Sequence, residues 1–253
     1  MVGALMAGAE PFFARGGRQG ALVLHGFTGN PFSMKGVSQA LAMAGMTVSA
    51  PLMPGHGTSV EDMLDSRFDQ WAACADAAFD ALATLCDRVV VVGLSMGGTI
   101  ASWLGVHRDD VAGLVLINPF IGSIPKDQRD ALLAAIDAGE TVVDGLGSDI
   151  AREDAVVLSY DKTPLVPLLS LVEAADQLAG RLQGIDCEVL LVSSRQDHLV
   201  PPANGDMIAA ALGERCTRVW LEHSFHVATL DYDAPEVERL SVEFSAKVTG
   251  APS

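Results

Sequence analysis

With 253 residues, of which 49% are apolar and 19% charged, the chain can bury one large α/β core, and its composition excludes a disordered protein. The 32 acidic and 16 basic residues give a net charge of −16, which argues against binding to nucleic acid or to anionic membrane surfaces. No apolar run approaches the ~18 residues that a membrane span needs, so we expect no stable membrane insertion.

The four cysteines lie far apart, with neither a CxxC motif nor the spacing of metal ligands. Cysteines in this pattern are typical of small buried side chains in a reducing compartment. The N-terminal residues 1–6 lack the basic residue and the long apolar run of a signal peptide. We therefore expect a cytoplasmic protein without a bound metal.

Apolar runs and helical spacing alternate along the chain, which predicts a mainly parallel sheet covered by helices on both faces. The predicted strands are residues 21–24, 47–50, 88–92, 111–117, 188–192 and 218–221. The predicted helices are residues 33–44, 68–85, 99–107, 164–182, 202–212 and 235–247.

Residues 118–164 interrupt this alternation, because they contain no strand-like run. Short helical patterns at 126–138 and 150–159, broken by glycines, predict a helical insertion between two strands of the sheet. We therefore expect a single domain over residues 1–253 with an insertion at about 119–164.

The strongest motif is Gly-x-Ser-x-Gly at residues 93–97, which follows four consecutive valines and precedes a predicted helix. This context is the one required of a nucleophile elbow, in which the serine sits on a tight turn between strand and helix. Unpaired N–H groups at the start of that helix favour negative charge nearby. Ser95 is therefore the candidate nucleophile.

A serine hydroxyl needs a general base, and the base needs a carboxylate to orient it. In α/β-hydrolases these follow the serine in the order acid, then histidine. Asp197 and His226 stand in that order, each just beyond a predicted strand. We favour His226 over His223, which lies directly at the strand end, and we expect His198 to face solvent or to support the aspartate loop.

The oxyanion of an acyl-transfer intermediate needs two backbone N–H donors. One is predicted to be the N–H of Met96, directly after the nucleophile. The other is predicted to be the N–H of Phe27, in the turn that follows the first predicted strand. We interpret His56, in a loop rich in glycine and proline, as a structural residue of that loop.

Five motifs together resemble the bacterial monoacylglycerol lipase and carboxylesterase group of α/β-hydrolases. They are residues 25–29, 54–58, 93–99, 197–202 and 224–231, and the similarity extends over nearly the whole chain. The resemblance implies the α/β-hydrolase fold, with a small helical cap inserted after the sixth strand, which matches the predicted insertion. It also implies the roles of Ser95, Asp197 and His226, and an oxyanion hole formed by Phe27 and Met96.

Caps in this family guard an apolar acyl channel and, in the lipases, help to hold the glycerol end of the substrate. We assign His25, Gly26, Leu146 and Val157 to substrate binding. Val157 is apolar where an acidic residue would support a glycerol site. An apolar cap could also join two copies of the chain in a homodimer, or it could close over its own site.

These observations predict a serine hydrolase that cleaves carboxylic esters through an acyl-enzyme, without a metal or an organic cofactor. Its expected substrate is a monoacylglycerol or a similar small-molecule ester. The alternatives are a broad-specificity carboxylesterase, an acyltransferase with the same triad, and a non-catalytic ligand-binding protein, which would be expected to lack a member of the triad.

Overall fold

The computed structural model describes residues 3–145 and 147–250. Seven strands form a sheet in the order β1-β3-β2-β4-β5-β8-β9, in which β1 is antiparallel to its neighbour and all other pairs are parallel. The strands are β1 (Phe12–Ala14), β2 (Gln19–Leu24), β3 (Thr47–Ala50), β4 (Arg88–Leu94), β5 (Val111–Ile117), β8 (Val189–Ser194) and β9 (Cys216–Leu221). The predicted α/β-hydrolase fold class is confirmed, and β1 is a strand that the sequence patterns did not predict.

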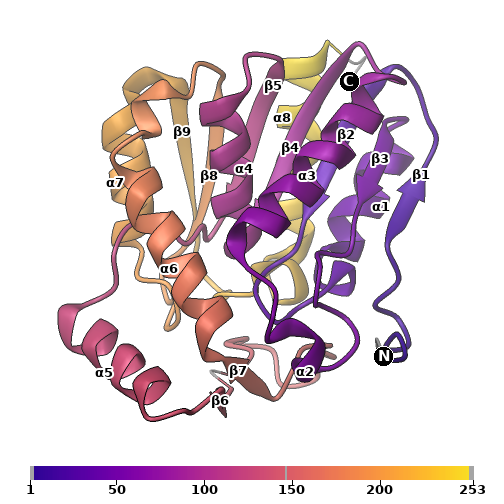
Figure 1. Cartoon of the computed structure of the whole chain (residues 1–253). Helices are drawn as coiled ribbons and strands as arrows, with labels where there is room; N and C mark the ends of the chain where they lie inside the picture. Colours follow the sequence, from indigo (N-terminus) through magenta and orange to yellow (C-terminus); the bar gives the residue numbers. More distant parts are fainter. Residues whose placement is uncertain (1–2, 146, 251–253) are drawn as a thin grey trace.

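Helices cover both faces of this sheet, as Figure 1 shows. One face carries α3 (Phe68–Ala83), α4 (Met96–His107), α6 (Leu165–Ala179) and α7 (Ala203–Leu212), and the other carries α1 (Lys35–Met43) and α8 (Ala234–Thr249). A short α2 (Val60–Met63) lies in the connection between β3 and α3. No helix in the described ranges is long and apolar enough to cross a membrane.

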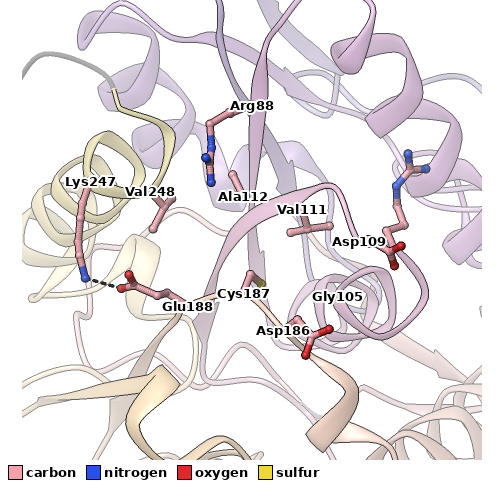
Figure 2. A pocket seen from close by; sticks show the side chains of 11 residues that line it. Arg88, Gly105, Asp109, Val111, Ala112, Asp186, Cys187, Glu188, Lys247 and Val248 are labelled. Atoms are coloured by element: carbon pink, nitrogen blue, oxygen red, sulfur yellow. Dashed lines mark hydrogen bonds and ion pairs between the residues drawn. The ribbon is translucent and has the colours of Figure 1, made fainter.

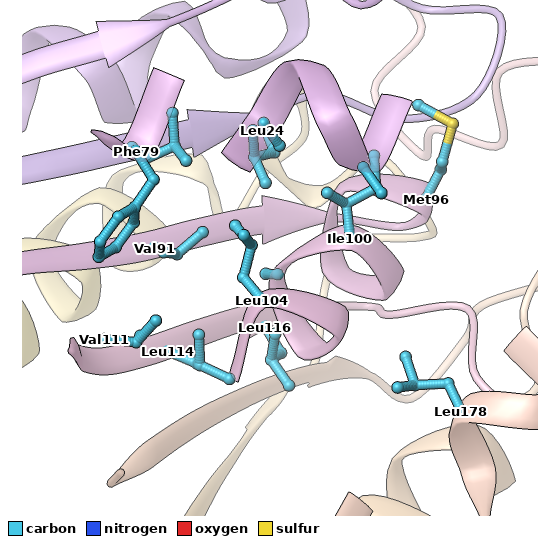
Figure 3. Close-up of a cluster of buried hydrophobic side chains, with 14 of the residues drawn as sticks. Leu24, Phe79, Val91, Met96, Ile100, Leu104, Val111, Leu114, Leu116 and Leu178 are labelled. Carbon is cyan, nitrogen blue, oxygen red and sulfur yellow. The ribbon is translucent and has the colours of Figure 1, made fainter. Parts of the chain in front are cut away.

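Alternate residues of the buried strands supply two apolar cores, one on each face of the sheet. Figure 3 shows the larger core, in which Ile100 and Leu104 of α4 pack against Val91 and Leu116 of the sheet. All four of these side chains are fully buried. The helix that follows Ser95 is therefore fixed to the sheet by its apolar side chains.

The register of the parallel strands brings their carboxyl ends to one edge of the sheet. Leu24 of β2 pairs with Gly93 of β4, Leu94 pairs with Ile117 of β5, and Ile117 in turn pairs with Val192 of β8. The segments that follow these strands carry His25, Ser95, Asn118 and Asp197, so they begin side by side.

Residues 119–164, here called the cap segment, lie between β5 and α6 and contain α5 (Lys126–Asp137). They also contain β6 (Val142–Asp144), which pairs with β7 (Lys162–Pro164) in a separate antiparallel ladder. Figure 1 shows these three elements together at one end of the molecule. The cap segment follows β5, the fifth strand, and not the sixth as expected, because only β1 precedes β2 among the described residues.

The expectation of a helix at 150–159 is wrong, and so is the expectation that the cap segment contains no strand. The backbone of residues 150–160 finds its partners in other segments instead of in a helix. The N–H groups of Ala151 and Arg152 donate to the carboxylate of Asp231, and the carbonyl oxygen of Leu158 accepts from the side chain of Asn30. These tertiary hydrogen bonds replace the local ones on which a helix depends.

Candidate active site

The elbow at Ser95 has the strained geometry expected of a nucleophile turn. Ser95 has φ 54° and ψ −116°, a conformation that non-glycine residues rarely adopt. Its N–H donates to the carbonyl oxygen of Ile117 at 3.0 Å, and its carbonyl oxygen accepts from the N–H of Phe120 at 3.3 Å. The segment after β5 thus holds the turn from both sides.

Gly93 and Gly97 are required by close backbone approach. A Cβ atom at Gly93 would lie 2.1 Å from the carbonyl oxygen of Gly97, and one at Gly97 would lie 2.2 Å from that of Leu24. The elbow can therefore close only without side chains at these positions. The close approach of Gly97 to Leu24 also places the start of α4 against the end of β2, next to the turn that contains Phe27.

Asp197 and His226 form a buried pair. Oδ2 of Asp197 accepts a hydrogen bond from Nδ1 of His226 at 2.7 Å, and both side chains are nearly inaccessible to solvent. Oδ1 of Asp197 accepts from the N–H groups of Leu199 and Val200 at 3.0 and 2.8 Å, which fixes the carboxylate. This arrangement leaves Nε2 of His226 outside the bond with Asp197, as the predicted role of general base requires.

Ser95 itself is not hydrogen-bonded to His226 in the described part of the chain. Such contacts often tighten only when substrate binds. The two residues are nevertheless linked through one short segment, because Ile117 and Phe120 hold the backbone of Ser95 while Asn118, between them, holds that of His226.

Asn118 is a structural residue of this site that the sequence analysis missed. Its Nδ2 donates to the carbonyl oxygens of His226 and Phe225 at 2.8 and 3.3 Å and to Oγ of Ser194 at 2.9 Å. Its Oδ1 accepts from the N–H of Ser194 at 2.7 Å, and its φ of 42° is one that asparagine tolerates better than most residues. An asparagine directly after a buried strand and before a proline was the available signal.

We expect Asn118→Ala to lower the free energy of unfolding by about 2–4 kcal/mol, because it leaves several buried polar groups without partners. We also expect a lower kcat, since the backbone of His226 loses an anchor. Urea denaturation and steady-state kinetics on the same preparation test both. Asn204→Ala is the matched control, because the side chain of Asn204 accepts a single hydrogen bond, from the N–H of Ile121. Equal stability of the two variants would contradict this role of Asn118.

In the turn after β2, His25 fixes the orientation of the peptide group that carries the N–H of Phe27. The peptide between Gly26 and Phe27 is held at its carbonyl end, where the Gly26 oxygen accepts from Nδ1–H of His25 at 2.9 Å and from the N–H of Gly29 at 3.2 Å. Nε2 of His25 accepts from the N–H of Met53 at 3.1 Å, so the proton of the neutral ring is on Nδ1. Within the described ranges, the N–H groups of Phe27 and Met96 donate to no other group of the chain.

Two buried histidines lie behind this turn in contact with aromatic rings. Burial lowers the pKa of His25 to about 4 and that of His56 to about 3. The ring of His56 lies 5.0 Å from that of His25 and 5.4 Å from that of Trp71, measured between centroids, and Nδ1–H of His56 donates to the Pro54 carbonyl oxygen. This environment agrees with a structural role for His56.

The two buried histidines should lower the free energy of unfolding in acid. In the unfolded chain both histidines become protonated as the pH falls below about 6.5, whereas in the folded chain they do so only at about pH 4 and pH 3. The unfolded state therefore binds more protons in this range, and stability that is present at neutral pH is lost. Between pH 7.5 and 5 we expect a loss of about 2 kcal/mol for each histidine. In urea denaturation, His56→Phe should lose about 2 kcal/mol less than the wild type over this range, and the exposed-site control His223→Phe should behave as the wild type. Equal pH dependence of His56→Phe and wild type would contradict the buried neutral state.

The site opens into a cavity of about 460 Å³ between the cap segment and the sheet. Ser95 and the loop at His198 form part of its wall, and the remainder is mostly apolar. Its other lining residues include Phe27, Phe120, Ile124, Gln128, Leu132, Tyr160, Thr163, Leu168, Leu171 and Val172. A cavity of this size and composition can hold the acyl chain of an ester.

The four residues assigned to substrate binding are placed differently. His25 is buried, and neither it nor Gly26 is among the residues that line the cavity; a Cβ atom at Gly26 would lie 3.5 Å from the Cβ of Ser95. Val157 is half-buried and is not part of the wall, and Leu146 lies outside the described residues. The structure therefore places neither His25 nor Gly26 in the wall of the cavity, and both belong to the turn that contains Phe27.

A second cavity of similar volume lies at the opposite edge of the sheet, where the strands begin (Figure 2). Its wall is strongly charged and includes Arg88, Asp186 and an ion pair between Lys247 and Glu188. Neither Ser95 nor the Asp197–His226 pair contributes to it, so the candidate active site is the cavity under the cap segment.

Comparison with known proteins agrees with this geometry. A family model described as serine aminopeptidase, S33, matches residues 18–233. The chain is 40% identical to a thermostable monoacylglycerol lipase of Bacillus sp. (strain H-257), over 97% of this chain and 98% of that one. It is also 24% identical to a carboxylesterase of Bacillus subtilis (strain 168), over 94% and 97%.

Among solved structures, one reported for metagenome-derived lipolytic enzymes superimposes with a TM-score of 0.90 at 36% identity, covering 96% of this chain and all of the other. A match over 216 residues of the family model, together with close relatives of the same length, shows that the chain belongs to this serine hydrolase family of the α/β-hydrolase fold.

Proposed function

We propose that this carboxylic ester hydrolase cleaves monoacylglycerols to a fatty acid and glycerol, with Ser95 as nucleophile, His226 as general base and Asp197 as its orienting acid. The observation that carries the proposal is the buried hydrogen bond between Asp197 and His226 at the edge where the strained Ser95 turn opens into an apolar cavity. The relative named as a monoacylglycerol lipase, with 40% identity, supports the substrate class.

In the first half of the reaction, Oγ of Ser95 attacks the ester carbonyl carbon while Nε2 of His226 takes its proton. The carbonyl oxygen becomes an oxyanion that accepts hydrogen bonds from the N–H groups of Phe27 and Met96. His226 then gives its proton to the leaving alcohol, and the acyl group stays on Ser95. Water, activated by His226, releases the acid in the second half.

We also propose that residues 119–164 act as a cap within a single domain, and that the protein works in the cytoplasm. The separate β6–β7 ladder and the position of α5 at the cavity wall support the cap. All four cysteines are free thiols, which supports a reducing compartment. The cap segment also exposes the apolar side chains of Val156, Leu133 and Val143, which supports packing against a second copy, and gel filtration tests such a homodimer.

A broad-specificity carboxylesterase is the second candidate function. It is favoured by the mostly apolar wall of the cavity, and by the relative that is named as a carboxylesterase. The deciding experiment compares kcat/KM for 1-monodecanoylglycerol and for methyl decanoate, which differ only in the alcohol. A strong preference for the glycerol ester is expected. Equal values would identify a carboxylesterase, and no turnover of either ester would overturn the hydrolase proposal.

A further inference from the structure

A second pair of aspartate and histidine lies beside the pair formed by Asp197 and His226. Nδ1 of His198 is 2.7 Å from Oδ1 of Asp149, which belongs to the cap segment. Oδ2 of the same carboxylate accepts from the N–H of His198 at 2.9 Å and from the N–H of His226 at 3.1 Å. One largely buried carboxylate therefore holds the backbones of both histidines, so their side chains start close together.

The imidazole of His198 is held in a defined direction but keeps one nitrogen free. Its edge packs against the ring of Phe225, with centroids 4.5 Å apart and ring planes at 89°. Its Nε2 has no hydrogen-bond partner among the described residues, although 58% of the side chain is exposed and the residue lines the cavity that contains Ser95. The free nitrogen is thus available to a molecule in that cavity.

The neighbourhood of His226 is where the alcohol portion of an ester has to lie. His226 gives its proton to the leaving alcohol oxygen, so that oxygen must come close to its Nε2. The walls supplied by α5 and α6, with Leu132, Leu168 and Leu171, are apolar and suit the acyl chain. The ring of His198 lines the cavity, and its backbone is held by the same carboxylate as that of His226, which puts it on the alcohol side of the cavity.

We propose that His198, held by Asp149, recognises a hydroxyl group on the alcohol portion of the substrate. In the neutral ring the free Nε2 accepts a hydrogen bond, and in the protonated ring it donates one, and a hydroxyl group is a partner for both forms. The ligand class is an ester of a polyol such as glycerol, which keeps a free hydroxyl near the leaving oxygen. This inference rests on the proposed ester hydrolysis and assigns its specificity to a residue outside the triad.

The test measures kcat/KM for 1-monodecanoylglycerol and for methyl decanoate in wild type, His198→Phe and His198→Gln. Covalent labelling of Ser95 with a fluorophosphonate gives the concentration of competent enzyme in each preparation. The ratio of the two kcat/KM values should fall about 3- to 10-fold in His198→Phe, as for loss of one hydrogen bond. In His198→Gln, whose amide can bind a hydroxyl, the ratio should fall less than in His198→Phe. The matched control is His223→Phe, the same change at an exposed histidine outside the cavity.

A ratio in His198→Phe equal to that of the wild type would overturn the proposal, and so would a wild-type ratio near one. A loss of the same size on both esters would also overturn it, because it would mean that His198 only supports the loop of Asp197. Failure of the underlying function is recognised separately, because the wild type would then hydrolyse neither ester. If His198→Phe does not label with the fluorophosphonate, His198→Ala takes its place, and a ratio in His198→Ala equal to that of the wild type would overturn the proposal.

Discussion

Replacing Ser95 with alanine is expected to lower kcat for 1-monodecanoylglycerol by at least about 10⁴-fold, as when the nucleophile of another serine hydrolase is removed. Without Oγ no acyl-enzyme forms, and the remaining oxyanion donors and base can only assist direct attack by water. The fold should not suffer, since an alanine at this turn keeps the backbone hydrogen bonds of residue 95 to Ile117 and Phe120. Fatty acid release and labelling by a fluorophosphonate, followed by mass spectrometry, measure the two consequences.

Ser102→Ala is the matched control for this variant. Ser102 lies in α4, the helix that follows Ser95, is fully buried, and uses its hydroxyl to donate to the carbonyl oxygen of Gly98. It should keep both activity and labelling. Retention of hydrolysis in Ser95→Ala at more than a hundredth of the wild-type rate would exclude Ser95 as the nucleophile.

The central strands were predictable because their residues are buried on both faces. β3 and β5 begin and end where the sequence predicts, at residues 47–50 and 111–117. For β5 the reason is plain, since a parallel strand inside a covered sheet appears as a continuous apolar run. The edge strand β1 is only three residues long, too short for its apolar residues to indicate a strand. Phe13, in its middle, is 58% exposed, and the strand exists through its pairing with β3.

The cap segment was predicted less well for a related reason. α5 has the expected bounds within one residue, because its spacing is local. β6 and β7 are three residues long and are separated by 17 residues of chain, so nothing in either strand reveals the pairing. The stretch at 150–159 has a helical pattern, but Asp231 and Asn30 take its backbone hydrogen bonds. Neither partner can be recognised from the stretch itself.

The three residues of the candidate triad were identified from their order in the chain and from their positions at the ends of predicted strands. Their catalytic roles remain predictions. The side chains that connect the loops across the sheet edge are harder to recognise from the sequence. Asn118 and Asp149 lie 108 and 77 residues from His226 along the chain, and each holds its backbone. Their importance depends on the register of β5 against β8 and on the path of the cap segment, which no local pattern fixes.

Asp197→Asn should lower kcat by about 10⁴-fold, by analogy with the same change in a serine protease triad, with little change in stability. The side-chain oxygen of asparagine can still accept from the N–H groups of Leu199 and Val200, which directs its NH₂ group towards Nδ1 of His226. Nδ1 must then act as the acceptor, so the proton of the neutral ring moves to Nε2. In that tautomer the ring cannot take the proton of Ser95. Steady-state kinetics and thermal denaturation test the two expectations.

Asp186→Asn removes the same charge at a fully solvated site and should keep its activity. Asp149 is the other carboxylate next to His226, yet it accepts from the backbone N–H and not from the imidazole, so it cannot set the tautomer. If Asp197→Asn kept more than a tenth of the wild-type kcat, the orienting role of Asp197 would be excluded. The loss should therefore be specific to Asp197, because within residues 3–145 and 147–250 only its carboxylate bonds both the ring of His226 and the loop that follows β8.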